Sequence, residues 1–157
     1  MVGAMDKPAS DSFMAQALDE ARAAASRGEV PVGAVVVEAA TGRILARAGN
    51  ETEAAHDPTA HAEILALRRA AQTRGEPRLP DCDLYVTLEP CAMCAAAISH
   101  ARIRRLYFGA YDPKGGGVEH GPRFFTQPTC HHAPEVIGGL DETAAAALLK
   151  DFFKERR

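Results

Sequence analysis

The sequence predicts one α/β domain, a three-layer α/β/α sandwich built around a mixed five-stranded sheet. Short apolar runs alternate along the chain with longer segments of helical periodicity, which is typical of a sheet covered by helices on both faces. The first two predicted strands are separated only by a turn at Thr41-Gly42, so they should pair as a hairpin and make the sheet mixed. The 157 residues contain no repeat or linker, which favours a single domain over residues 11–157.

The first third of the chain predicts one helix and a hairpin. Ser10 or Asp11 can cap the helix, apolar residues follow at helical spacing, and Gly28 ends it. Val32 to Val37 is a short apolar run, as expected of a buried strand. The second strand is expected from Arg43 to Ala48.

The middle of the chain predicts two helices around a third strand. Asp57-Pro58-Thr59 is expected to open the second helix, which stops before Gly75. The third strand is expected from Leu84 to Leu88. Pro90 then marks the start of a helix through Cys91 to His100.

The last third predicts two strands, a long loop and a final helix. The fourth strand is expected from Ile103 to Ala110, and the fifth from Glu135 to Ile137. The Gly- and Pro-rich segment between them, about residues 111–134, is long enough to suggest a functional loop. The last helix should begin near Asp141 and present an apolar face made of Ala145, Leu148, Leu149 and Phe152.

Composition excludes several classes of protein. No run approaches the roughly 20 apolar residues of a membrane span. Residues 1–10 resemble neither a signal peptide nor an anchor, so we expect a flexible tail and a cytoplasmic protein. The four cysteines then favour metal or thiol chemistry over disulfides. The net charge of −3 gives no sign of nucleic-acid binding and weighs mildly against an RNA substrate, although it does not exclude a local basic patch.

Two short motifs predict a catalytic zinc site. Cys91 and Cys94 are three residues apart on one helix face, and a helix N-terminus favours the thiolate form. Together with His61 they make a zinc-type ligand set, and three protein ligands leave the fourth tetrahedral position to water. Glu63 does not share a helix face with His61, but at the open end of a helix both side chains can reach one cavity. We therefore expect one zinc ion per chain, with Glu63 carrying protons.

Other interpretations of these residues remain open. A lone C-x-x-C could be a redox pair or half of a zinc knuckle. A structural zinc would need a fourth ligand, for which the candidates are His56, His100, His131 and His132. Cys130-His131-His132 could form a second metal site. The H-x-E motif upstream of P-C-x-x-C favours catalysis instead, because this combination is the signature of zinc-dependent nucleobase deaminases.

Longer stretches carry a more specific resemblance. The segments His56–Glu63, Tyr85–Cys94, Phe108–Gly116 and Asp151–Arg157 resemble the bacterial tRNA adenosine deaminases. The similarity runs from about Phe13 to the end of the chain. The two metal motifs are shared with free-base deaminases, whereas the run Thr87-Leu88-Glu89-Pro90, the loop at Asp112 and the C-terminal helix point more narrowly to tRNA.

The resemblance implies a cytidine deaminase-like fold and a homodimer. It also implies hydrolytic deamination of the wobble adenosine to inosine in the anticodon loop of a tRNA, an arginine tRNA in this family. On this resemblance Asn50 and Ala62 bind the flipped base and Asp112 contacts a neighbouring ribose. Phe153, Lys154, Arg156 and Arg157 then face the RNA from the last helix. An aromatic residue beside cations offers stacking and phosphate contacts, although a frayed, solvated helix end has the same composition.

One segment departs from the family pattern, and two other functions stay open. Residues 118–125 read VEHGPRFF where many family members carry a short Gly-Ser-Leu stretch. This segment should border the substrate mouth, so it bears on which substrate is used. The first alternative is a zinc deaminase of a free base or nucleoside such as guanine or cytosine. The second is a non-catalytic zinc-binding module, which leaves Glu63 and Asn50 without a role.

Overall fold

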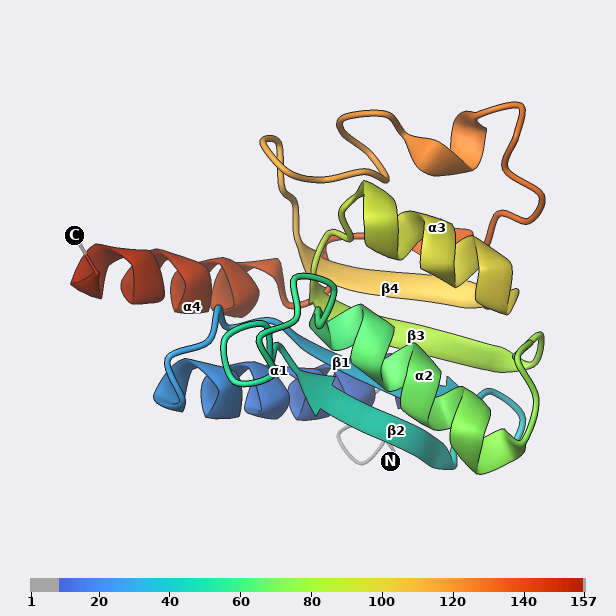
Figure 1. The fold of residues 1–157 in the computed structure, drawn as a ribbon, viewed down its shortest axis with the longest axis horizontal. Coiled ribbons are helices and arrows are strands. Elements are labelled where there is room, and N and C mark those ends of the chain that lie inside the picture. The colour runs from blue at the N-terminus through green and yellow to red at the C-terminus, as the bar shows by residue number, and fades with distance from the viewer. Residues whose placement is uncertain (1–8, 157) are drawn as a thin grey trace, which may run out of the picture.

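The computed structural model describes residues 9–156, with side chains from Phe13 onward, and contains one five-stranded sheet (Figure 1). The sheet order is β2-β1-β3-β4-β5. The strands are β1 (Gly33–Glu38), β2 (Ile44–Gly49), β3 (Cys82–Leu88), β4 (Arg105–Ala110) and β5 (Glu135–Ile137). The helices are α1 (Ala9–Ser26), α2 (Ala62–Arg74), α3 (Ala92–Ala101), the 3-10 turn η2 (Phe124–Thr126) and α4 (Glu142–Glu155).

The sheet is mixed, as predicted. Strand β1 runs antiparallel to both β2 and β3, whereas β3, β4 and β5 are parallel to one another. Helix α3 is the crossover between the parallel strands β3 and β4, and α2 connects β2 to β3. Both helices therefore begin beside the carboxyl end of β3.

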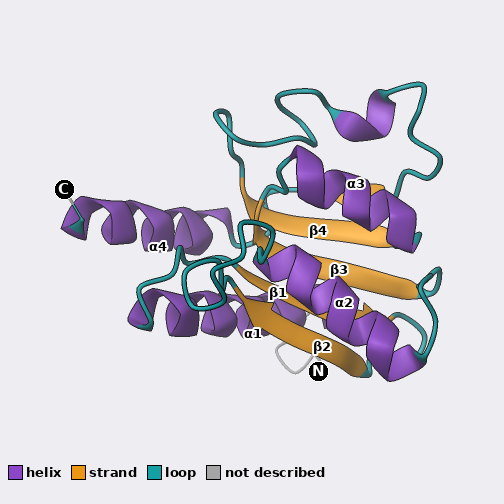
Figure 2. Ribbon diagram, in the orientation of Figure 1, coloured by secondary structure: helices purple, strands orange, loops and turns teal. Residues whose placement is uncertain are grey.

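Helices cover both faces of the sheet, which confirms the three-layer sandwich (Figure 2). Helices α1 and α4 pack on one face, over a core that includes Met14, Val35 and Tyr85. Helices α2 and α3 pack on the other, over a larger core that includes Val36 and Phe108. Within the described residues no helix is long and apolar enough to cross a membrane.

Most predicted element boundaries lie within one or two residues of those observed, but the predicted start of α2 was wrong. Asp57-Pro58-Thr59 does not open the helix. Instead, Asp57 accepts hydrogen bonds from the backbone N–H and the hydroxyl of Thr59, at 2.9 and 2.8 Å. This closes a local turn, and α2 begins four residues after Pro58, at Ala62. Gly75 ends α2 in a left-handed conformation with φ of 74°, as predicted.

The ends of the chain complete the comparison. Helix α1 begins at Ala9, one residue before the first predicted cap. Residues 1–8 of the predicted tail lie outside the described residues, as does Arg157. The predicted apolar face of α4 packs inward, with Ala145 and Phe152 buried, while Phe153 is 49% exposed.

Candidate metal centre and active site

The N-termini of α2 and α3 meet at one point beside the end of β3. His61 is the N-cap residue of α2, and Cys91 is the N-cap residue of α3. Both have extended backbones, with ψ of 152° and 176°, and neither side chain caps its own helix. Each side chain is therefore free to turn away from its helix and face the other.

Three predicted ligand atoms converge at this point. Nδ1 of His61 lies 3.7 Å from Sγ of Cys91 and 3.4 Å from Sγ of Cys94. All three atoms lie within 4.8 Å of one another. Zinc–sulfur and zinc–nitrogen distances of about 2.3 and 2.0 Å place tetrahedral ligands roughly 3.5–3.8 Å apart. The separations of Nδ1 from the two sulfur atoms therefore suit one zinc ion, with His61 presenting Nδ1.

The two thiols have opposite acidities, as expected of groups that share a proton. A hydrogen bond from Cys94 lowers the pKa of Cys91 to about 4, against the effect of burial and with help from His61. The same hydrogen bond and burial raise the pKa of Cys94. The hydrogen bond to Cys91 also raises the pKa of His61. The site therefore stabilises one thiolate, that of Cys91, and the thiolate is the form of cysteine that binds a metal ion.

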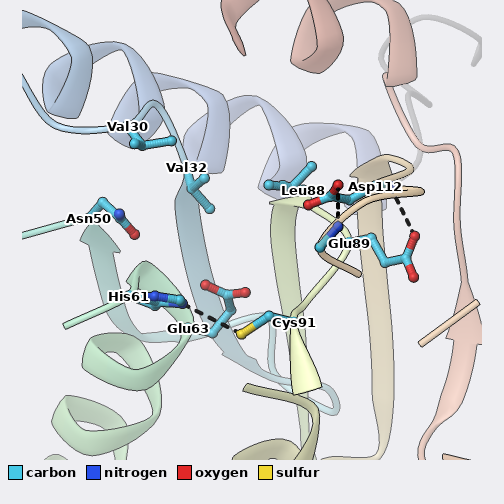
Figure 3. Close-up of a pocket in the computed structure, with 10 residues that line it drawn as sticks. Val30, Val32, Asn50, His61, Glu63, Leu88, Glu89, Cys91 and Asp112 are labelled. Carbon is cyan, nitrogen blue, oxygen red and sulfur yellow. Dashed lines mark hydrogen bonds between the residues drawn. The ribbon is translucent and has the colours of Figure 1, made fainter. Parts of the chain in front are cut away.

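Glu63 lies in the same cavity and is 4% exposed (Figure 3). Burial raises the pKa of its carboxyl group to about 7, and the nearby Cys91 charge acts in the same direction. A carboxyl group of this acidity can both accept and donate a proton near neutral pH. The first turn of α2 thus brings His61 and Glu63 to one cavity, as the motif predicted.

The cavity is small and open to one side. Its volume is about 290 Å³, at the lower end of the roughly 300–1,000 Å³ usual for ligand pockets. It can enclose a nucleobase, while the remainder of a polynucleotide must stay outside. Its lining residues are Val30, Val32, Asn50, His61, Glu63, Leu88, Glu89, Cys91, Asp112 and Gly115.

Asn50 lines the cavity beside the start of α2, next to His61. Its Oδ1 accepts the backbone N–H of Ala62 at 3.0 Å, which fixes the orientation of the amide group. Among the described residues its Nδ2 has no protein acceptor, so it can donate to a ligand in the cavity. Ala62 is fully buried, and its N–H is engaged by Asn50. Ala62 thus orients Asn50, and a direct contact with substrate remains a prediction.

Asp112 lines the cavity as well, and Glu89, to which the sequence analysis assigned no individual role, holds it there. The backbone N–H of Asp112 donates to Oε1 of Glu89 at 3.0 Å. Burial raises the pKa of Glu89, but the hydrogen bonds that it accepts outweigh burial and lower the pKa overall. The signal that could have revealed it is an acidic residue directly after a buried strand.

A second hollow adjoins the cavity and leads to the last helix. Its volume is about 360 Å³, and Val30, Leu88 and Asp112 line both spaces. Tyr111, Leu149 and Phe153 complete it, and the two aromatic residues are the large apolar side chains most exposed in the described chain. Phe153 thus borders the hollow as its predicted role requires.

The basic residues at the end of α4 differ in their surroundings. Lys154 is exposed, whereas the guanidinium of Arg156 lies 3.6 Å from the ring centroid of the buried Phe152. Arg156 therefore stabilises the helix end as well as contributing charge. Arg157 lies outside the described residues.

The other metal-site candidates do not assemble. Within the described residues, the group His61, Cys91 and Cys94 is the only cluster of potential ligands. The His132 ring contacts the carbonyl oxygen of Ile103 at 2.7 Å, and Cys130 lies near Ser99. His56, a candidate fourth ligand, is exposed and does not line the cavity.

Comparisons with known proteins agree with this geometry. The family model of the cytidine and deoxycytidylate deaminase zinc-binding region matches residues 8–110. The tRNA-specific adenosine deaminase of Agrobacterium fabrum is 62% identical over 145 residues, 92% of this chain and 94% of the relative. The tRNA-specific adenosine deaminase of Bacillus subtilis is 41% identical over 92% of this chain and 89% of its own.

Solved structures show the same relationship. One, from a study of A-to-I editing by tRNA:A34 deaminases at the wobble position of transfer RNA, superposes with a TM-score of 0.86. It shares 62% identity and covers 88% of this chain and 99% of its own. The guanine deaminase of Nitrosomonas europaea superposes with a TM-score of 0.80 at 26% identity, over 90% of this chain and 83% of its own. The chain therefore belongs to the cytidine and deoxycytidylate deaminase family, and within that family to the tRNA-specific adenosine deaminases.

Proposed function

We propose that this protein hydrolyses the wobble adenosine in a tRNA anticodon loop to inosine, with release of ammonia. The observation that carries the proposal is the cavity in which His61, Cys91, Cys94 and Glu63 converge beside Asn50. This cavity is the size of one base, so the base must leave its stack to enter. The relatives with the same activity in their names match almost the whole chain.

His61, Cys91 and Cys94 would hold one zinc ion. When bound, the ion would act as a Lewis acid that makes a water molecule nucleophilic near neutral pH. Glu63 takes one proton from the attacking water and delivers it to the purine ring nitrogen; it then takes the remaining hydroxyl proton and delivers it to the departing amine. The water oxygen becomes the oxygen at C6 of the base, and the C6–N bond breaks. Asn50 donates from Nδ2 to orient the base.

The second hollow supports an oligonucleotide substrate over a free base. Tyr111 and Phe153 expose aromatic surface directly beside the cavity. Lys150 and Lys154 are exposed on the same helix, α4. Stacking surfaces with nearby cations are how proteins bind single-stranded loops. An arginine tRNA is the substrate that the family resemblance implies, and a tRNA-modifying enzyme of this kind would act in the cytoplasm.

A free-base deaminase is the second candidate function, because the guanine deaminase of Nitrosomonas europaea shares the fold. A free base would occupy the zinc cavity and leave Tyr111 and Phe153 without a contact. The third candidate, a non-catalytic zinc module, does not account for a buried carboxyl group beside the ligands. Ammonia release from any nucleobase substrate excludes that third candidate.

Removing any one ligand should empty the metal site. His61→Ala, Cys91→Ala or Cys94→Ala each leaves two of three protein ligands, so we expect close to zero zinc per chain and some loss of stability. Zinc content by mass spectrometry checks this. Cys82→Ala is the matched control, since Cys82 is buried like Cys94 but is not part of the cluster, and it should retain the metal. Full zinc and activity in Cys91→Ala would contradict the ligand assignment.

Glu63→Gln should separate catalysis from metal binding. The substitution keeps the size of the side chain but cannot carry a proton, so zinc and fold should persist. We expect kcat to fall by at least roughly 10²- to 10⁴-fold, the usual contribution of a general acid or base. Near-normal turnover would mean that another residue carries the proton. The exposed His56 is the control, because His56→Gln should leave kcat nearly unchanged.

The decisive test of substrate uses an anticodon stem-loop with a wobble adenosine, with inosine as the readout. Wild-type protein should deaminate it and should be slow with free adenine, guanine and cytosine. Phe153→Ala should weaken stem-loop binding by roughly 1–3 kcal/mol if a base stacks on the ring. Lys154→Ala with Arg156→Ala should flatten the salt dependence by about one unit for each phosphate contact removed.

Two controls keep that test specific. Phe152→Ala removes the buried neighbour of Phe153 and should cost stability, about 3 kcal/mol, whereas Phe153→Ala should cost little. Thermal melting of each variant, including Arg156→Ala, separates lost packing from lost binding. Fast turnover of a free base with no stem-loop activity at any salt concentration would reject the tRNA substrate.

We infer that the protein is a homodimer through the outer faces of α2 and α3. An apolar hollow lies between these helices, lined by Ile64, Leu67, Ala71, Pro77, Ala97 and Ala101 with Arg68 and His100. We expect Ala97→Arg to shift the protein from dimer to monomer, because it places a charge in this hollow. Gln72→Arg, an exposed control on α2, should not. Sedimentation analysis checks both, and a wild-type monomer would contradict the inference.

A further inference from the structure

Glu89 is a buried carboxylate that the proposed chemistry does not use. It follows β3 directly, and its side chain is 0% exposed. Its carboxylate points away from the metal ligands, toward the loop of residues 111–120 (Figure 3). Burying a charged group costs free energy because the group loses its hydrogen bonds to water. A buried carboxylate therefore needs protein hydrogen-bond donors in their place.

Five donors from that loop supply the compensation. Oε1 accepts the backbone N–H of Asp112 at 3.0 Å and faces Nδ1 of His120 at 2.8 Å. Oε2 accepts three consecutive backbone N–H groups, those of Val118, Glu119 and His120, at 3.2, 2.8 and 3.1 Å. An ionised carboxylate only accepts, so His120 carries its proton on Nδ1. The Glu89 side chain therefore forms hydrogen bonds with both ends of the loop.

The middle of the loop is packed against the same group. The Gly116 N–H donates to the carbonyl oxygen of Asp112 at 2.9 Å, and the Gly117 N–H to that of Pro90 at 2.7 Å. A Cβ atom on Gly116 would overlap the Glu89 carboxylate, and one on Gly117 would overlap the backbone of Cys91 and Ala92. Only glycine at these positions lets the loop lie so close to the start of α3.

This loop provides walls for both hollows. Asp112 lines the base cavity and the second hollow, and Tyr111 lines the second hollow. The His120 ring packs edge-on to Tyr111, with ring centroids 6.3 Å apart. His120 thus contacts the buried carboxylate on one side and an exposed aromatic wall on the other. It lies in the segment that departs from the family pattern.

We propose that Glu89 and His120 are positioning residues that fix Asp112 and Tyr111 against the part of the oligonucleotide outside the base cavity. The proposal rests on the proposed function, because only a substrate larger than a base reaches this wall. Greater mobility of Asp112 and Tyr111 should weaken binding of the RNA stem-loop and leave the metal ligands and Glu63 in place. Its signature is a raised KM for the stem-loop with kcat and zinc content preserved.

The experiment compares two substitutions of His120. His120→Leu keeps bulk but loses the donor, whereas His120→Asn keeps an N–H donor near the position of Nδ1. We expect His120→Leu to raise KM about tenfold or more, and His120→Asn to recover most of that loss. Hydrogen exchange is the second readout: the amides of residues 118–120 should lose protection in His120→Leu while those of α3 keep it. Glu89→Gln should show the same pattern more strongly.

The outcomes separate this inference from the function on which it rests. Wild-type protein without stem-loop activity would reject the proposed function, and this inference with it. Wild-type activity with an unchanged KM in His120→Leu would reject the positioning role alone. A fall in kcat together with zinc loss would also overturn it, since the residues would then act through the metal centre. Equal damage in His120→Leu and His120→Asn would show that the donor to Glu89 is not what matters.

Discussion

The structure depends on the meeting of two helix N-termini beside the carboxyl end of one strand. Helices α2 and α3 both begin there, and their cap residues, His61 and Cys91, turn toward each other instead of capping their own helices. The antiparallel β1 is joined to this end of β3 by a hydrogen bond from the Gly33 N–H to Thr87 Oγ1 at 3.1 Å. A ligand site at the carboxyl end of a strand, where the topology changes, is a general property of open α/β sheets.

Two buried carboxylates fix the conformations of the loops around the site. Glu89 holds the loop that carries Asp112, and Glu29 performs a comparable role on the opposite side. Glu29 is 1% exposed and accepts the backbone N–H groups of Glu53 and Ala54 at 3.2 and 2.8 Å. Without such an acceptor, the backbone N–H groups of an irregular loop would have only water to donate to. An acceptor with two oxygens satisfies several at once, so a loop without regular structure gains a defined shape.

Local patterns were sufficient for most of the fold and for the centre of the site. The apolar periods and the Gly75 cap depend on neighbours in sequence, and the spacing of Cys91 and Cys94 is set by the helix itself. The start of α2 was wrong because Asp-Pro-Thr suits a helix N-terminus and a closed turn equally well. The role of Glu89 was missed for another reason: its donors lie 23 to 31 residues away, and no local pattern indicates which distant loop will pack on a buried acid.

The same packing explains why net charge was a poor guide to the substrate. The formal charge of −3 counts Glu29, Glu63 and Glu89, which are buried, with Glu29 and Glu89 directed at backbone N–H groups. A phosphate at the surface responds chiefly to charges within about 8 Å, the screening length at physiological salt. Around the second hollow those charges include the exposed Lys150 and Lys154 of α4, together with the exposed Asp151 and Glu155 and with Asp112 in its lining. The field that an RNA substrate would meet there is set by these local charges, which the summed charge of the chain does not represent.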